Sequence, residues 1–191
     1  MTKGRMEAFS DGVLAIIITI MVLEMKVPHG THLNALKPLL PVLISYVLSF
    51  IHVAIYWNNH HHMLHAAQKI NGTVLWTNIH LLFWLSLFPF VTGWMGENNF
   101  TTIPVALYGV VALMSGVAYY FLAHCLTGLH GKNSSFAKAL GSDTKGKLSV
   151  IIYALGIGLC FIHPLIALGL YFLVTIIWFI PDKRFENKES A

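Results

Sequence analysis

Residues 5–23 read RMEAFSDGVLAIIITIMVL, and this stretch decides the fold. From Val13 onward it is almost entirely apolar, and the whole run supplies the roughly twenty residues that a helix needs to cross a bilayer core. Its first two turns carry an Arg, a Glu, a Ser and an Asp. Charged groups at membrane depth are costly, so they usually face protein or water and serve a function. Because the stretch lacks the small-residue cleavage site of a signal peptide, we interpret it as a permanent, functional first helix.

The composition of the whole chain is that of a membrane protein. Of its 191 residues 56% are hydrophobic and only 10% are charged, whereas about a quarter are charged in a typical soluble domain. Apolar runs recur from end to end, which argues against a soluble protein with one buried core. Cys125 and Cys160 lie within apolar runs and indicate neither a disulfide framework nor a cysteine metal site. The net charge of +4 comes from loop lysines, which membrane orientation explains better than nucleic-acid binding.

Six hydrophobic segments divide the chain, which we interpret as a single domain, residues 1–191. The pattern predicts an all-α integral membrane protein with helices at about 6–25, 39–58, 74–95, 102–126, 148–162 and 165–180. Only His163 and Pro164 separate the last two segments, and proline ends helices, so we expect a tight hairpin there. The fifth segment has only about fifteen residues, which leaves open five crossings plus a re-entrant piece.

The distribution of Lys and Arg predicts the orientation. With six spans, one side of the membrane holds ten of the twelve Lys and Arg residues, and the other side holds only Lys26 and Lys37. Positively charged loops stay in the cytoplasm, so both termini are predicted to be cytoplasmic. With five spans, the three cations near the C-terminus would change sides and the asymmetry would fall to seven against five.

A helix advances about 100° per residue, so the first helix has two distinct faces. One face forms a stripe along the whole crossing, made of Phe9, Gly12, Ile16, Thr19, Ile20 and Leu23. Asp11 lies about 140° from Ile16 and is therefore predicted to point into the protein. Arg5 precedes Asp11 by six residues and lies about 120° away from it, so the two are poorly placed to pair.

Both charges therefore need partners from other segments, because a lone buried charge costs several kcal/mol. Candidates are the polar residues that end the second segment and begin the third: Asn59, His60, His61, Trp76, Asn78 and His80. Such a cluster could serve only to fix helix packing. The apolar stripe has a common alternative role too, since apolar residues at helical spacing usually pack against neighbours or lipid.

The histidine run 60–62 also invites a metal or haem interpretation. Adjacent helical residues point about 100° apart, so three consecutive histidines cannot share one ion from a regular helix. His61 and His65 have the i, i+4 spacing found in zinc sites, but no HExxH motif or cysteine ligand accompanies them. The weaker candidates for haem ligation are His52, His80 and His124. Without a catalytic triad, P-loop or glycine-rich nucleotide loop, we predict no enzyme, metal or cofactor.

The start of the first helix resembles the signature of the transmembrane protein 175 family of potassium-permeable channels, in the run RxxxFSDGVxAI over residues 5–16. The runs YWxNHH at 56–61, WxN at 76–78 and LxPF at 87–90 are similar to the family's second and third helices. With the length and the final hairpin, the resemblance covers most of the chain. It implies a homotetramer with four first helices around a central pore. It also implies no K⁺-channel filter loop, and no TVGYG-like segment occurs here.

The resemblance also implies roles for individual residues. Ile16, Ile20 and Leu23 match the family's apolar pore constriction, and Thr19 matches the polar position beside it. The remaining positions match the signature and the polar network thought to hold the first three helices together: Arg5, Phe9, Ser10, Asp11, Trp57, Asn59, His60, His61, Trp76 and Asn78. His62 and His65 extend the histidine patch beyond the family's pattern.

We therefore expect a homotetrameric channel permeable to K⁺ and other monovalent cations. Because this chain has one repeat where the human lysosomal relative has two, we expect a bacterial plasma membrane. A ring of apolar side chains can gate by excluding water but cannot replace a hydration shell, so K⁺ over Na⁺ selectivity should be modest. One alternative is a small proton-coupled transporter that uses Asp11 and nearby histidines as a relay. The other is a histidine-ligated membrane enzyme or haem protein.

Overall fold

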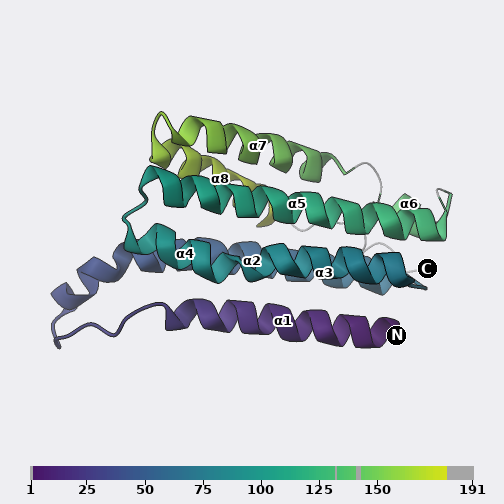
Figure 1. Ribbon diagram of the computed structural model, residues 1–191, viewed down its shortest axis with the longest axis horizontal. Helices are drawn as coiled ribbons and strands as arrows, with labels where there is room; N and C mark the ends of the chain where they lie inside the picture. The colour runs from purple at the N-terminus through teal and green to yellow at the C-terminus, as the bar shows by residue number, and fades with distance from the viewer. Residues whose placement is uncertain (1, 132, 141–142, 180–191) are drawn as a thin grey trace.

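The computed structural model describes residues 2–131, 133–140 and 143–179, and these residues form helices and connections without a β-strand. Figure 1 shows the long helices lying side by side along one axis. In chain order the elements are α1 (Lys3–Leu23), the 3₁₀-helix η1 (Leu33–Leu39), α2 (Leu40–Ala66), α3 (Gly72–Ser86), α4 (Phe88–Glu97), α5 (Thr102–His130), α6 (Ser135–Leu140), α7 (Thr144–Cys160) and α8 (Pro164–Phe179).

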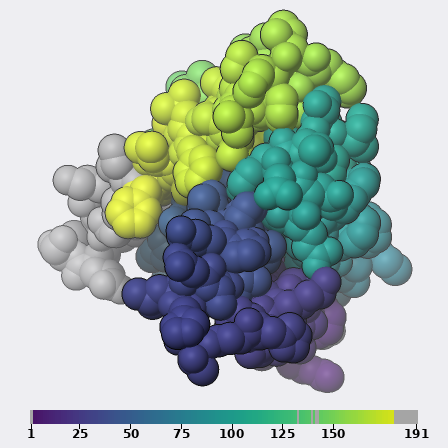
Figure 2. All heavy atoms as spheres, turned by 90° about the vertical axis from the view of Figure 1, so that its left-hand side faces the viewer, coloured from purple at the N-terminus to yellow at the C-terminus, as the bar shows by residue number. Residues whose placement is uncertain are grey.

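The first helix, α1, is packed on one face only. Its buried residues recur at intervals of three and four, which is the spacing of one helical face: Met6, Ser10, Leu14, Ile17 and Met21. This face contacts α2, α3 and α4. Seen from the end of the bundle, α1 lies at one edge and the α7–α8 pair at the opposite edge (Figure 2).

The second long helix, α2, extends to Ala66, beyond the predicted end at residue 58. It follows η1 directly, and Pro41 lies in its first turn, where a missing N–H breaks no helical hydrogen bond. The run 57–65 stays helical because several of its polar side chains find partners on neighbouring helices or on the helix itself. The chain then turns and starts α3, where the Asn71 side chain caps the helix by accepting a hydrogen bond from the Val74 N–H at 2.9 Å.

The predicted third helix, 74–95, is two helices that are joined at Leu87. Proline is the physical reason, because Pro89 has no N–H for the carbonyl of Leu85 and its ring conflicts with that carbonyl. Leu87 keeps a right-handed helical backbone, with φ −83° and ψ −12°. The break is therefore local, and Gly72–Glu97 remains one apolar stretch long enough to cross a membrane.

The C-terminal half contains α5, the short α6 and a helical hairpin of α7 and α8 that packs on α5. A turn over residues 161–163 separates α7 from α8, and Pro164 is the first residue of α8. Two glycines let these helices approach closely around the ring of Tyr171. A Cβ on Gly109 of α5 would overlap the Tyr171 hydroxyl, and one on Gly156 of α7 would lie 2.7 Å from its Cε1 atom.

The helix ends gather at two ends of the bundle (Figure 1). At one end Lys3 Nζ donates to the His65 carbonyl at 3.2 Å, and the N–H of Gln68 donates to His130 Nε2 at 3.0 Å. These bonds join the start of α1 to the end of α2, and the following loop to the end of α5. At the other end Lys26 pairs with Glu97 at 2.9 Å, and this carboxylate raises the pKa of Lys26 above its ordinary value.

Among the described residues, four stretches are long and apolar enough to span a membrane: Lys3–Leu23, Leu33–Ala66, Gly72–Glu97 and Thr102–His130. The helices of the hairpin are shorter. With 17 and 16 residues, α7 and α8 are each about 25 Å long.

Candidate functional site

The stripe predicted on the first helix coincides with the face of α1 that the other described helices leave uncovered. Ile16 is 58% exposed, Ile20 40% and Leu23 77%, although all three are large apolar residues. Ile17, only one position away from Ile16, is 4% exposed and packs in the core. The exposed row therefore follows helical periodicity and leaves an apolar surface along the length of α1.

Part of this row lines an open groove between α1 and α4, with a volume of about 640 Å³. On the α1 side the groove is lined by Val13, Ile16, Ile17, Ile20 and Glu24, and on the other side by Ser86, Pro89, Phe90, Gly93, Trp94 and Glu97. Its walls are mainly apolar, and its two carboxylates lie at the end where α1 and α4 finish.

Thr19 is the polar member of the stripe and is exposed. Its hydroxyl donates to the carbonyl of Ala15 at 2.9 Å and lies 3.1 Å from that of Ile16. The proton of the hydroxyl therefore stays within the helix, and the oxygen presents lone pairs as an acceptor on this face.

A buried chain of hydrogen bonds joins the first three predicted helices. His60 Nε2 on α2 donates to Asn78 Oδ1 on α3 at 2.7 Å, and Asn78 Nδ2 donates to Ser10 Oγ on α1 at 3.0 Å. Ser10 Oγ then donates to the Met6 carbonyl at 2.8 Å. All three side chains are at least 98% buried. Each group donates to the next, so the chain fixes the relative register of α1, α2 and α3.

The Asp11 side chain does not point into the protein, although the sequence predicted that it would. Its side chain is exposed and accepts a hydrogen bond from Trp57 Nε1 on α2 at 3.0 Å. The wheel angle of Asp11 places it at the boundary between the packed and uncovered faces, because the buried face is centred on Ser10 and Leu14. The carboxylate is therefore an inter-helix acceptor at the edge of the α1–α2 contact.

Arg5 was predicted to bend toward a partner in the second or third helix. Among the residues that the structure describes, its exposed side chain makes no hydrogen bond or ion pair. The first turn instead pairs Lys3 with Glu7, at 3.7 Å on the same helix. Exposure at the helix end removes the burial cost that would require a partner.

Four other predicted members of the polar network lie outside the buried chain. Phe9 is exposed on the uncovered face of α1, and Trp76 is 73% exposed on α3. His61 is exposed and stacks between Trp57 and His65. Asn59 donates to the Ile55 carbonyl of its own helix and faces α5, because its backbone carbonyl accepts from Tyr119.

A second buried polar cluster surrounds His52, which the sequence suggested only as a weak haem ligand. The Tyr153 hydroxyl lies 2.7 Å from His52 Nε2, and the Thr175 hydroxyl lies 3.2 Å from His52 Nδ1. The Nδ1 atom also lies 3.2 Å from the Leu48 carbonyl. The cluster thus joins α2, α7 and α8. The sequence did not predict this cluster, because Tyr153 and Thr175 lie in separate apolar segments and a single hydroxyl within such a segment indicates no partner.

The histidines considered for metal or haem are distributed among different contacts. His80 Nε2 accepts a hydrogen bond from Trp84 Nε1 at 2.9 Å, and His124 stacks on Tyr120. Within the described residues, no group of three or more His, Cys, Asp or Glu side chains is arranged to hold a metal ion. The polar groups that the fold does bring together act between helices, as packing contacts.

The fold and these contacts define an α-helical membrane protein with an apolar, uncovered first helix. Residues 5–89 match the TMEM175 family, described as the endosomal/lysosomal potassium channel TMEM175. A potassium channel of Chryseobacterium sp. (strain P1-3) is 54% identical over 98% of this chain and 97% of its own length. The chain belongs to the TMEM175 family.

More distant relatives agree over the full length. A potassium channel of Streptomyces collinus is 27% identical over 99% of this chain and 97% of that protein. The crystal structure of a lysosomal potassium-selective channel TMEM175 homolog from Chamaesiphon minutus superposes with a TM-score of 0.78, at 26% identity, over 93% of this chain and 96% of that one. The likeness therefore includes the C-terminal hairpin as well as residues 5–89.

Proposed function

We propose that four copies of this chain form a potassium-permeable cation channel, with the uncovered face of α1 lining a central pore. The observation that carries the proposal is the two-sided character of α1. One face is fixed to α2, α3 and α4, whereas the other described helices leave the face with Ile16, Ile20 and Leu23 uncovered. Cyclic symmetry would bring four such faces together around one axis. The relatives named potassium channels support the same function.

In this arrangement three apolar rings would restrict permeation. Rings of Ile16, Ile20 and Leu23 would gate by excluding water, because an apolar constriction dewets when it is narrow. Thr19 would add acceptor oxygens close to the rings. Isoleucine side chains have no polar atoms that could replace the water molecules around an ion, so K⁺ over Na⁺ selectivity would be modest.

We further propose six crossings with both termini in the cytoplasm of a bacterial cell. The pair α3 and α4 would make one crossing, and α7 and α8 would each make one. Lengths of about 25 Å for α7 and α8 approach the bilayer core of about 30 Å. The grouping of helix ends supports this topology, because α1, α3 and α7 begin at the same end of the bundle (Figure 1).

The proton-coupled transporter is less well supported by the contacts. A relay needs an unbroken chain of groups that accept and donate protons. In the described part of the chain Asp11 bonds to Trp57, whose indole N–H does not release its proton, and no hydrogen bond joins Asp11 to a histidine.

A planar-bilayer recording of the purified protein, with K⁺ on one side and Na⁺ on the other, tests the proposal. We expect linear single-channel currents with a reversal potential that shows a modest preference for K⁺. Saturable, coupled flux without single-channel currents would contradict a channel and favour the transporter.

A further inference from the structure

A second cavity lies on the far side of the molecule from the α1 stripe, between α2, α5, α7 and α8. Its volume is about 380 Å³, within the range of about 300–1,000 Å³ that holds small ligands. None of the residues that line it belongs to α1, α3 or α4. It is therefore separate from the proposed pore.

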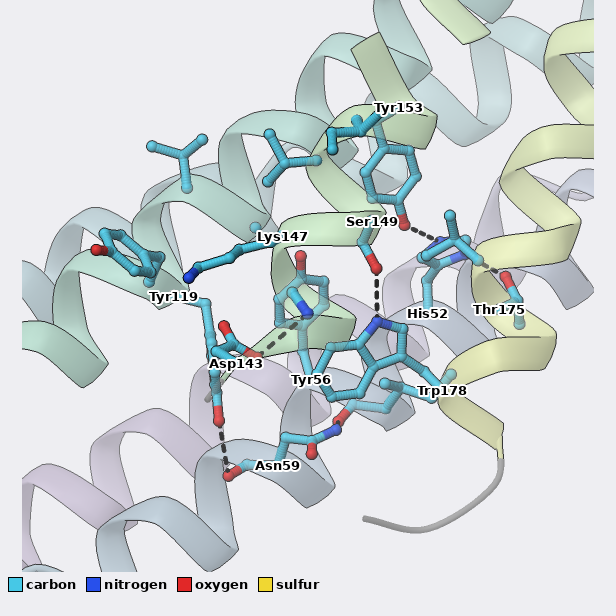
Figure 3. A pocket seen from close by; sticks show the side chains of 18 residues that line it. His52, Tyr56, Asn59, Tyr119, Asp143, Lys147, Ser149, Tyr153, Thr175 and Trp178 are labelled. Carbon is cyan, nitrogen blue, oxygen red and sulfur yellow. Dashed lines mark hydrogen bonds between the residues drawn. The ribbon is translucent and has the colours of Figure 1, made fainter. Parts of the chain in front are cut away.

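The cavity is elongated and its walls are apolar. Along α2 it extends from His52 to Asn59, a rise of about 10 Å for seven residues. Besides tyrosine and tryptophan rings, five aliphatic side chains line the walls: Ile55, Val117, Val150, Ile151 and Val174. At the inner end His52 is bonded to Tyr153 and Thr175, so its ring nitrogens are already satisfied (Figure 3). Such a space favours an aliphatic chain over a polar solute.

The other end of the cavity is amphipathic and carries Lys147 together with Asp143, whose carboxylate caps α7 by accepting from the Gly146 N–H. The exposed side chain of Lys147 lines it, and Lys145 Nζ lies 5.9 Å from the ring centroid of Trp178. Trp178 Nε1 donates to Ser149 Oγ at 2.8 Å, which fixes the indole against the cavity. Figure 3 shows Lys147, Asp143 and Tyr119 at this end, away from His52 and Thr175. Tryptophan beside lysine is typical of the membrane–water interface.

We propose that this cavity binds one acyl chain of an anionic phospholipid, with its phosphate at Lys147. The apolar walls fit the chain, and the lysines at the start of α7 fit a negative headgroup. Basic pockets between membrane helices on the cytoplasmic side are a known setting for anionic headgroups. With the six crossings proposed above, on which this step rests, the ten-to-two excess of Lys and Arg assigns this end of the bundle to that side.

Native mass spectrometry of the detergent-purified protein with equimolar phosphatidylglycerol and phosphatidylcholine tests the site. The wild type should retain phosphatidylglycerol over phosphatidylcholine by about fivefold, the effect of one lysine near an anionic lipid. Lys147→Glu should abolish this preference. Lys138→Glu is the matched control, because it makes the same charge change in α6 outside the cavity. Equal retention of the two lipids by the wild type would overturn the proposal, as would an unchanged preference in Lys147→Glu.

A second pair of variants tests where the acyl chain lies. Gly116 of α5 lines the cavity and has room for a Cβ, 3.6 Å from the Tyr56 hydroxyl, so Gly116→Leu should fold and fill the space. Gly128→Leu is its control on the same helix, with open space and no part in the cavity. We expect Gly116→Leu to lose the bound phosphatidylglycerol and Gly128→Leu to retain it. Full retention by Gly116→Leu would show that the lipid binds elsewhere, and equal competition by free oleate would assign the site to a fatty acid instead.

Discussion

Ile16 and Ile17 are neighbours in sequence with the same side chain, yet one is 58% exposed and the other 4%. The difference comes from a rotation of about 100° between successive helical residues. Burying an isoleucine is favourable by about 1.5–3 kcal/mol, so an uncovered apolar row carries a free-energy cost in water that lipid or another subunit would remove. The same side chain thus stabilises the fold at Ile17 and is available for a different role at Ile16.

Ile16→Asn should raise conductance or relax K⁺ over Na⁺ selectivity, because a polar ring holds water where the apolar ring excludes it. Ile18→Asn is the control, since Ile18 lies about 160° from Ile16 on the helix and packs partly against the core. Single-channel recording of both variants measures the effect. Equal changes in the two variants would contradict the pore-lining role of Ile16.

Two substitutions of Asp11 test whether its carboxylate acts as a hydrogen-bond acceptor or through its negative charge. Asp11→Asn keeps an oxygen for the Trp57 N–H, so it should leave the thermal stability nearly unchanged. Asp11→Leu removes the acceptor and should cost about 1 kcal/mol. Both variants should keep near-normal selectivity, because the carboxylate is bonded to α2. A large shift of the reversal potential in well-folded Asp11→Asn would place Asp11 in the permeation path.

At the scale of the helix, the buried chain from His60 to Ser10 predicts a measurable contribution to stability. Asn78→Leu would leave the His60 N–H without its acceptor in a buried site, which costs about 1–3 kcal/mol. Thermal unfolding in detergent measures this cost.

Thr77→Val is the matched control for Asn78→Leu, because among the described residues the Thr77 hydroxyl bonds to carbonyls of its own helix alone. The double variant His60→Leu with Asn78→Leu should be more stable than the sum of the single changes predicts, since both partners are then apolar. A stability of Asn78→Leu equal to that of Thr77→Val would show that the chain contributes little.

The positions of the helices were largely predictable, because each long helix needs an apolar run that hydropathy detects. Several helix boundaries differ from the prediction, and two of the differences have an identifiable physical reason. The extension of α2 to Ala66 depends on contacts of its polar side chains with other helices, which a single segment does not reveal. The break at Leu87 was marked by Pro89, but a proline in an apolar run is compatible with a kinked helix as well as with two helices.

The candidate site was predictable to the extent that it depends on periodicity. The stripe on α1 follows from angles alone, and Ser10, His60 and Asn78 were among the predicted members of the polar network. Which polar residues meet depends on the register between helices, so the partner of Asp11 and the exposure of Arg5 could not be derived from one helix.

At the scale of the molecule, the alignment of helix ends makes the proposed topology testable. With native Cys125 and Cys160 replaced, single cysteines can be placed at His32, Asn133 or Ser190 and labelled with an impermeant maleimide. In intact cells only His32→Cys should react, because its loop would lie outside. Asn133→Cys and Ser190→Cys should react after permeabilisation. Labelling of Ser190→Cys in intact cells would indicate five crossings, with only one of α7 and α8 crossing the membrane; residue 190 lies outside the described residues.

The uncovered face of α1 also determines the expected assembly. In the described part of one chain no second surface closes a water-filled path along this face, whereas four copies would enclose one. Cross-linking in mild detergent should therefore give a ladder of bands that ends at four subunits. A bismaleimide should join subunits of Leu23→Cys, at the exposed end of the row, far more than subunits of Ile18→Cys. A stable monomer with single-channel currents would contradict this assembly, because one α1 helix offers ions only one wall.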